Sequence, residues 1–278
     1  MLIADAINYA QQQFIKSDSA RLDADVLLCS VLKCERIYLY TYPEKKLSNT
    51  SLSSFNKLIT LRIKGYPIAH LIQKKEFWSL NLKVTTDTLI PRPETEILVE
   101  AALDIVPKEH PLSILELGTG TGAISIAIAS DRHLAKITAT DIKKAALEVA
   151  IANAKSHQLN NITFKIANWF DIKDINTYDL IISNPPYICI DDPHLKKGDI
   201  RFEPESALIS GKQGLDDLHI IIIGAKDYLN KNGWLLLEHG HQQGKVIRQL
   251  LKDNNYSTIS TLKDYSNLDR VSIGQWTS

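Results

Sequence analysis

Residues 115–123 read Leu-Glu-Leu-Gly-Thr-Gly-Thr-Gly-Ala, a glycine-rich loop between two apolar runs. Residues 113–117 before the loop have the pattern of a buried strand, and residues 122–130 after it have that of a helix. Glycines let the backbone approach a ligand closely, and a helix N-terminus presents unpaired N–H groups. The stretch therefore predicts a nucleotide-type pocket. The loop residues expected to line it are Gly118, Thr119, Gly120, Thr121 and Gly122.

Helix and strand patterns alternate from residue 94 to the last residues of the sequence. We expect helices at residues 94–106, 122–130, 143–156, 215–230 and 241–253, and strands at residues 113–117, 136–140, 162–167, 179–183 and 233–238. Two further β-like runs, near residues 256–261 and 270–275, close the pattern. Seven strands alternating with helices are typical of an α/β fold with a doubly wound, Rossmann-like sheet.

Residues 1–73 read as a separate helical domain. Two predicted helix faces are Ile3, Ile7, Ala10 and Phe14, and Leu22, Val26, Leu27 and Val31. We interpret Asp23 and Asp25 as solvated helix charges rather than catalytic acids. Residues 74–93 alternate in polarity and end in a proline pair, which predicts a hairpin-like connector. Residues 94–278 form the second domain.

The tetrapeptide Asn184-Pro185-Pro186-Tyr187 follows the apolar strand-like run directly. In open α/β sheets, ligands bind where such strands end. Two prolines remove two N–H donors, so the Asn184 side-chain oxygen and the Pro185 carbonyl can accept both N–H groups of a planar amide or exocyclic amine. Tyr187 can stack on the same plane. The competing interpretation is a rigid loop, because Asn and Pro also form turns.

Asp141 ends the predicted strand at residues 136–140, twenty-three residues after Gly118. A carboxylate there suits two ribose hydroxyls, and it also suits the N-cap of the next helix. Gly118, Gly120 and Ala123 satisfy the dinucleotide fingerprint as well, so a dehydrogenase must be considered. Hydride transfer needs an acid or base that Asn-Pro-Pro-Tyr lacks. S-adenosylmethionine has an electrophilic methyl group, so a poor nitrogen nucleophile needs placement and desolvation instead, and methyl transfer is favoured.

The order of the glycine loop, the acidic strand end and Asn-Pro-Pro-Tyr resembles the class I S-adenosylmethionine-dependent methyltransferases that act on planar nitrogens. Further stretches narrow the resemblance: residues 76–80, 89–96, 168–170, 201–204 and 236–240. Ile-Pro-Arg-Pro-Glu-Thr-Glu at residues 90–96, joined to Asn-Pro-Pro-Tyr, is strongly specific. Over essentially the whole chain, these residues resemble the release-factor glutamine methyltransferases of the PrmC/HemK type.

The resemblance implies a methyltransferase fold with a small helical partner-binding domain. It implies that residues 118–122 line the methionine part of S-adenosylmethionine, that Asp141 holds the ribose, and that Asn168 and Trp169 lie beside the adenine. Asn184 would touch both methyl donor and substrate. The implied catalytic residues are Asn184, Pro185 and Tyr187, and Pro186 completes the substrate site.

The implied substrate is the glutamine of the Gly-Gly-Gln tripeptide in class 1 peptide chain release factors, whose methylation supports translation termination. This chain departs from the family at three positions, because Glu116, Glu94 and Asn168 stand where the family usually has Asp. Glu116 and Glu94 keep the charge. Asn168 keeps an acceptor oxygen without the carboxylate, so the departure concerns only how the adenine is held.

The composition favours a cytoplasmic protein. The 278 residues contain 32 basic and 32 acidic side chains, so we expect no direct nucleic-acid partner. The three cysteines form neither a disulfide framework nor a Cys-x-x-Cys set, which indicates a reducing compartment. His239-x-His241 lacks further ligands at metal spacing, so we expect no metal. We expect no membrane partner, because no apolar run approaches the length of a membrane span. We expect no signal peptide, because the first residues have no basic region followed by a long apolar core.

Residues 188–214 form a long, charged, irregular stretch after Tyr187, which we interpret as a lid over the substrate. Three functions remain. The first is a protein-glutamine N5-methyltransferase. The second is a nucleic-acid exocyclic-amine methyltransferase, which a basic insertion would have favoured. The third is a non-catalytic adapter, in which the glycine loop or the Asn-Pro-Pro-Tyr residues would be degraded, and here both are intact.

Overall fold

The computed structural model describes residues 1–172 and 176–278. The chain divides into two compact units. The smaller unit consists of Met1–Lys74 and His194–Phe202, and the larger unit consists of Lys75–Pro193 and Glu203–Ser278. The stretch at residues 188–214 is therefore shared between the two units. Within the described residues, no helix is both long and apolar enough to cross a membrane.

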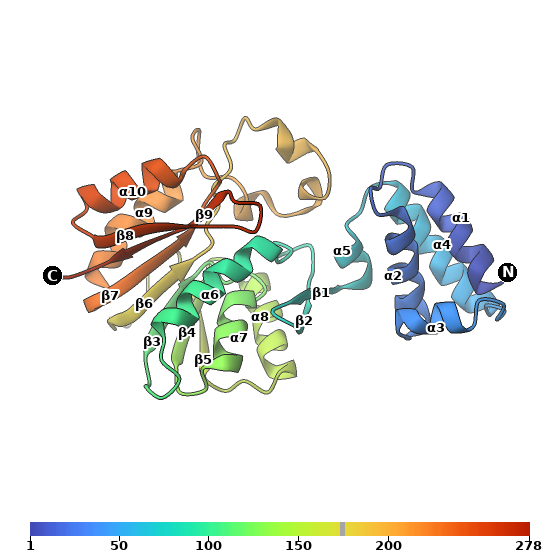
Figure 1. The fold of residues 1–278 in the computed structure, drawn as a ribbon, viewed down its shortest axis with the longest axis horizontal. Helices are drawn as coiled ribbons and strands as arrows, with labels where there is room; N and C mark the ends of the chain where they lie inside the picture. Colours follow the sequence, from blue (N-terminus) through green and yellow to red (C-terminus); the bar gives the residue numbers. More distant parts are fainter. Residues whose placement is uncertain (173–175) are drawn as a thin grey trace. The chain divides into compact units, whose positions relative to one another are not determined.

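The smaller unit is built from helices around one apolar core (Figure 1). They are α1 Ile3–Gln13, α2 Ala20–Leu32, α3 Arg36–Thr41, α4 Asn49–Ile63 and α5 Ile68–Ile72. The predicted face of α1 is confirmed, because Ile3, Ile7, Ala10 and Phe14 are all buried. The predicted face of α2 is wrong at Leu22, which is 44% exposed. Leu27 of that face is buried as predicted, and the helix also buries Ala24 and Leu28.

Asp23 and Asp25 are buried in the smaller unit, so the interpretation of both as solvated charges is wrong. Asp23 Oδ2 accepts hydrogen bonds from Arg62, with Nη2 at 2.8 Å. Asp25 Oδ2 accepts from Arg36 Nη2 at 2.9 Å and from the Tyr40 hydroxyl at 2.6 Å. A buried carboxylate is tolerated when charged partners surround it. Arg36, Tyr40 and Arg62 lie outside α2, so the spacing of residues along this helix could not reveal the burial.

A two-stranded hairpin begins the larger unit's chain. Strands β1 Lys74–Phe77 and β2 Leu80–Lys83 are joined by Trp78 and Ser79, whose φ angles are 53° and 56°. Two residues in the left-handed region form the turn whose twist suits a hairpin. The Asn153 side chain fixes the hairpin to the larger unit, because it accepts from Lys83 N at 2.7 Å and donates to Lys83 O at 3.0 Å.

In its described residues, the larger unit contains a seven-stranded sheet with the order β5-β4-β3-β6-β7-β9-β8. The strands are β3 Ser113–Leu117, β4 Lys136–Asp141, β5 Ile162–Ile166, β6 Tyr178–Ser183, β7 Leu229–Glu238, β8 Ser257–Lys263 and β9 Asp269–Gln275. Neighbours from β5 to β7 pair in parallel, whereas β9 is antiparallel to both β7 and β8. The predicted α/β fold class with a Rossmann-like sheet is confirmed.

Helices cover both faces of this sheet (Figure 1). They are α6 Glu96–Ile105, α7 Ala123–Asp131, α8 Lys144–Ser156, α9 Asp216–Gly224 and α10 Gly244–Asp253. Alternate strand residues point to opposite faces. Ile114, Leu180 and Leu236 pack with α6 and α7, whereas Leu115, Ile181 and Leu235 pack with α9 and α10. Chain order reverses on the two sides of β3, and a ligand crevice is expected at such a switch point.

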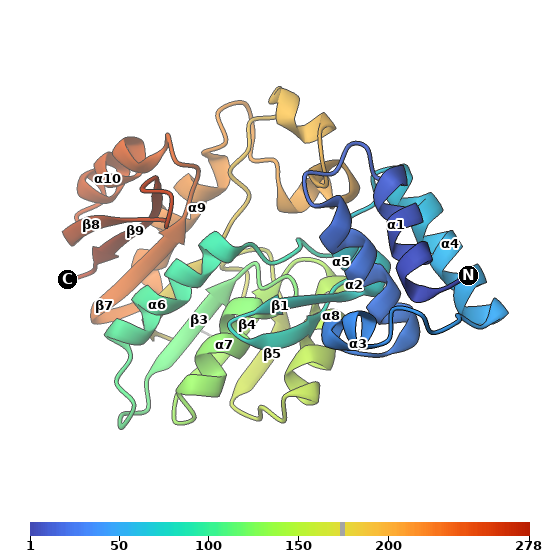
Figure 2. The same ribbon diagram turned by 45° about the vertical axis from the view of Figure 1, so that its right-hand side comes forward.

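The predicted helix at residues 215–230 ends too late. Helix α9 ends at Gly224, a 3₁₀ turn follows at Ala225–Asp227, and β7 begins at Leu229. Leu229 pairs with Tyr178 of β6, and the register then shifts before Trp234 pairs with Leu180. Pairing with β6 therefore extends β7 into residues that local pattern assigned to the helix. Residues 188–214 connect β6 to α9 along the chain (Figure 2) and contain 3₁₀ turns at Pro193–Lys196, Ile200–Phe202 and Glu205–Ala207.

Candidate active site

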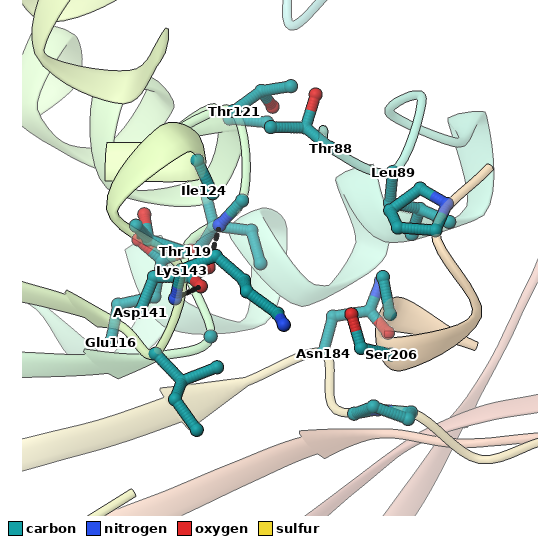
Figure 3. Close-up of a pocket in the computed structure, with 18 of the residues that line it drawn as sticks. Thr88, Leu89, Glu116, Thr119, Thr121, Ile124, Asp141, Lys143, Asn184 and Ser206 are labelled. Atoms are coloured by element: carbon teal, nitrogen blue, oxygen red, sulfur yellow. Dashed lines mark hydrogen bonds between the residues drawn. The ribbon is translucent and has the colours of Figure 1, made fainter. Parts of the chain in front are cut away.

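A cavity of about 400 Å³ lies at the carboxyl ends of β3, β4 and β6 in the larger unit. Its lining includes these residues expected from the sequence: Gly118, Thr119, Gly120, Thr121, Asp141, Asn168, Trp169, Asn184 and Pro186. Figure 3 shows Glu116, Thr119 and Asp141 on one side of the cavity, and Asn184 and Ser206 on the other. Gly122, Pro185 and Tyr187 are not part of its lining.

The glycine loop connects β3 to α7 through a backbone that needs glycine. Gly118, Gly120 and Gly122 have φ angles of 72°, 54° and 80°, in the left-handed region that side chains disfavour. A Cβ atom at Gly120 would meet no atom within 4 Å, whereas one at Gly122 would lie 3.1 Å from the Ala150 Cβ atom. Gly120 therefore leaves space at the cavity, and Gly122 allows α7 to pack closely against α8.

Asp141 fastens this loop to the end of β4. Its Oδ2 atom accepts from Gly120 N at 2.9 Å, and its Oδ1 atom accepts from Lys143 N at 2.8 Å. Burial raises the pKa of the Asp141 carboxyl, and the hydrogen bonds from Lys143 and Gly120 oppose that rise. Helix α8 begins at Lys144 with Lys143 as its N-cap, so Asp141 is not the N-cap residue. It is a carboxylate at the cavity wall that also shapes the glycine loop.

Glu116 is a buried carboxylate in the same wall, with one oxygen paired and the other free. Its Oε2 atom accepts from Thr119 Oγ1 at 2.6 Å and from the amide and hydroxyl groups of Ser125. Its Oε1 atom has no hydrogen-bond partner among residues 1–172 and 176–278. Burial raises the pKa of Glu116 to about 7. A cation or N–H donor in the cavity would satisfy Oε1 and favour the charged form.

Trp169 follows β5 and turns its ring toward the glycine loop. A Cβ atom at Gly118 would lie 3.5 Å from the ring atom Cζ3 of Trp169. Trp169 has a φ angle of 50°, and its Nε1 atom donates to Asp217 Oδ1 at 3.1 Å. The preceding residue, Asn168, also lines the cavity. The ring therefore forms a flat apolar wall next to the backbone of the glycine loop.

Asn184 and Tyr187 point to different places. The Asn184 Nδ2 atom donates to Thr95 Oγ1 at 3.2 Å, and Asn184 lines the cavity. The Tyr187 hydroxyl donates to Glu238 Oε1 at 3.3 Å, and its ring packs with the apolar cluster around α9 and α10. Burial raises the pKa of Tyr187. In this structure Tyr187 lies outside the cavity lining, and its stacking on the substrate stays a prediction.

Reasoning from spacing missed the contribution of residues 87–95 to the cavity. Thr88, Leu89, Pro91, Arg92 and Thr95 line it. Arg92 pairs with the buried Glu203 carboxylate, which also accepts from Ile90 N at 3.1 Å. Residues 89–95 and Glu203 lie in two of the stretches that carried the family resemblance. That resemblance was the sequence signal for their place at the cavity. Pro204, Ser206, Ala207 and Ile209 from residues 188–214 line the cavity too, while the lid remains a prediction.

His239 lies in the loop after β7, fully buried. Its ring nitrogens contact Gly240 O at 2.9 Å and Ser272 Oγ at 2.8 Å. Burial lowers the pKa of this histidine. Across residues 1–172 and 176–278, no group of three or more His, Cys, Asp or Glu side chains is arranged to hold a metal ion.

Comparisons with known proteins agree with this geometry. Residues 108–273 match a methyltransferase domain family, and residues 5–72 match the PrmC N-terminal domain. A release factor glutamine methyltransferase from Aliivibrio fischeri is 47% identical, covering 94% of this chain and 92% of that protein. One of the same name from Shewanella oneidensis is 45% identical, covering 99% of this chain and 96% of that protein.

Among solved structures, a methyltransferase from Pyrococcus furiosus has the same fold. Its TM-score is 0.54 at 20% identity, and the match covers 81% of this chain and 100% of that one. The methyltransferase domain, the cavity at the strand ends and the two curated relatives lead to one conclusion. The chain is an S-adenosylmethionine-dependent enzyme that belongs to the release factor glutamine methyltransferase family.

Proposed function

We propose that the protein transfers a methyl group from S-adenosylmethionine to the side-chain amide nitrogen, N5, of the glutamine in the Gly-Gly-Gln motif of class 1 peptide chain release factors. Methylation of this glutamine would support translation termination. The observation that carries the proposal is the Asn184 amide. Its Nδ2 atom is bound to Thr95 Oγ1 at 3.2 Å, so its oxygen remains available to accept from a planar amide at the cavity.

The residues of the cavity fit the cofactor. S-adenosylmethionine supplies an electrophilic methyl group when bound. Asp141 would hold its ribose hydroxyls, and the unpaired Glu116 Oε1 atom would accept from its ammonium group. Gly118 and Gly120 keep side chains out of the way of the methionine part, and the Trp169 ring offers a flat wall for the adenine. Asn168 would lie beside Trp169 at the adenine.

Acceptors, rather than a strong base, would place the substrate amide, and the nitrogen would give up one proton to water when it is methylated. The Asn184 oxygen would accept one N–H group, and the Pro185 carbonyl, which follows it directly in the chain, would accept the other. Both acceptors would hold the nitrogen in line and stabilise the positive charge that develops on it. Tyr187 would hold the Asn-Pro-Pro-Tyr segment in place through its hydroxyl bond to Glu238. Pro186 would form the part of the cavity wall next to the substrate. Loss of water from the nitrogen on binding would strengthen these polar contacts.

We propose that the helical domain at residues 1–73 binds the release factor, that residues 74–93 connect it, and that residues 94–278 carry out methyl transfer. We also propose that the enzyme acts in the cytoplasm on a protein substrate, without direct contact to nucleic acid or membrane. The equal numbers of acidic and basic residues, 32 each, support this choice of partner.

Methylation of purified class 1 release factor, followed by mass spectrometry of the Gly-Gly-Gln peptide, tests the function. We expect one added methyl group on the glutamine, and none when this glutamine is replaced by Glu, because a carboxylate would face two acceptor oxygens. Asn184→Ala should slow transfer by roughly two to three orders of magnitude. Asn160→Ala, at an exposed position between α8 and β5, is the matched control and should behave like the parent.

Two outcomes would overturn the proposal. One is methylation of DNA or RNA at a rate comparable with that of the release factor under the same conditions, which would favour the nucleic-acid alternative. The other is a release factor that stays unmodified although calorimetry shows that the protein binds S-adenosylmethionine.

A further inference from the structure

We infer that Thr95 and Glu238 are positioning residues that set which end of the Asn184 amide faces the substrate. The inference rests on the proposed function, because only an amide or amine substrate needs the oxygen end. Neither residue is expected to touch the reacting atoms. They would act by keeping the Asn184 oxygen at the cavity and its nitrogen away from it.

The Asn184 amide needs such a partner because its two ends have nearly the same shape. The oxygen end accepts hydrogen bonds, and the nitrogen end donates them. With the nitrogen end at the cavity, a donor would face the N–H groups of the substrate. In the structure the nitrogen end donates to Thr95 Oγ1 at 3.2 Å. A threonine hydroxyl both donates and accepts, so Thr95 alone does not distinguish the two orientations.

Glu238 supplies the missing distinction. An ionised carboxylate only accepts hydrogen bonds, so it attracts the Thr95 proton and leaves the Thr95 oxygen to accept from Asn184. The Thr95 hydroxyl lies beside the Glu238 carboxylate and lowers its pKa by hydrogen bonding. Glu238 Oε2 nevertheless has no partner within regular hydrogen-bond limits among the described residues. Oε2 is therefore an acceptor without a regular donor, and the Thr95 hydroxyl is the neighbouring group that can supply one.

The sheet explains why these groups meet. Strands β6 and β7 pair in parallel with Ser183 opposite Leu237, so Asn184, the residue after β6, lies beside Glu238, the last residue of β7. Thr95 lies where the 3₁₀ turn Pro93–Thr95 leads into α6 and is 4% exposed, while Glu238 is 1% exposed. The same carboxylate accepts from the Tyr187 hydroxyl at 3.3 Å. One buried carboxyl group thus lies next to two segments of the predicted site.

The charge on Glu238 should make this arrangement sensitive to pH. Burial raises its pKa to about 7, Thr95, Arg270 and Tyr187 lower it, and Glu94 raises it. Below that pH the carboxyl group carries a proton and can donate to Thr95, which removes the preference for one Asn184 orientation. With cofactor and substrate saturating, kcat should therefore decline as the pH falls through about 7. Glu238→Gln should lower kcat and remove this decline.

The test combines variants at Thr95 with kinetics, calorimetry and thermal unfolding of the full chain. Thr95→Val keeps the shape and removes the hydroxyl, and Thr95→Ser keeps the hydroxyl. We expect Thr95→Val to lower kcat by about ten- to hundredfold. KM for the release factor, affinity for S-adenosylmethionine and the unfolding temperature should stay close to the parent values. Thr95→Ser should restore most of the rate.

A double-mutant cycle separates positioning from a merely structural role. In an Asn184→Ala background, Thr95→Val should change the rate little, because no amide is left to orient. An equal loss in both backgrounds would overturn the inference, and so would a parent-like kcat for Thr95→Val. The inference would also be overturned if the unfolding temperature of Thr95→Val fell along with its activity. Failure of the parent to methylate the release factor would instead contradict the proposed function.

Discussion

Two glycines of the same loop should fail in different ways when replaced by alanine. Gly120 and Gly122 both have a positive φ angle, 54° and 80°. An L-residue in the left-handed region costs roughly 1–2 kcal/mol, and loss of chain freedom in the unfolded state offsets about 0.4–1 kcal/mol of that. Gly120→Ala and Gly122→Ala share both contributions to the free energy of unfolding, so these cancel when the two variants are compared with each other.

The difference comes from what the new methyl group meets. At Gly122 it would lie 3.1 Å from the Ala150 Cβ atom and 3.3 Å from its Cα atom, which belong to the backbone side of α8 and cannot swing away. Overpacking of this kind costs about 1–3 kcal/mol, so Gly122→Ala should be less stable than Gly120→Ala by that amount. At Gly120 the methyl group meets no atom within 4 Å and should interfere with the cofactor instead.

Tryptophan fluorescence during denaturant unfolding measures the stability of the larger unit, because all four tryptophans lie within residues 75–278. Calorimetry measures the affinity for S-adenosylmethionine, which should fall about tenfold or more in Gly120→Ala and much less in folded Gly122→Ala. The reasoning is refuted if Gly120→Ala is the less stable variant, or if Gly122→Ala loses cofactor affinity with its stability intact.

Three further variants test individual contacts of the cavity. Asp141→Ala should weaken binding of S-adenosylmethionine by about 1.5–3 kcal/mol, the range for charged hydrogen bonds, and unchanged affinity in calorimetry would contradict its assignment. Asn184→Asp should bind the cofactor at least as well as the parent but transfer the methyl group more slowly, since better ground-state binding does not lower the barrier; single-turnover rates check this. Burial raises the pKa of Glu116 to about 7, and only its ionised form pairs with an ammonium group, so cofactor affinity should fall as the pH drops below that value. Glu116→Gln should show no such fall in calorimetric titrations, and an identical pH dependence in both proteins would exclude the pairing.

The sequence predicted the local elements of the larger unit well because their signals are local. The strand at residues 113–117 is found at the same bounds, and α7 begins one residue after the predicted start at residue 122. Helix α7 buries all of Ala123 to Ala129, as a segment whose residues are apolar except for Ser125 predicts. The glycine loop also signals its own backbone, because only glycine adopts positive φ angles without strain.

Contacts between distant residues were decided by the tertiary structure alone. Asp23 is buried against Arg62, and Asn184 meets Thr95 across 89 positions of the chain. The pairing of Ser183 with Leu237 brings Glu238 beside the segment of Asn184, and Tyr187 turns to that carboxylate. Helical or strand periodicity shows which face of an element is apolar. It does not show which polar group another element brings to that face, because this depends on strand order and register across the whole sheet.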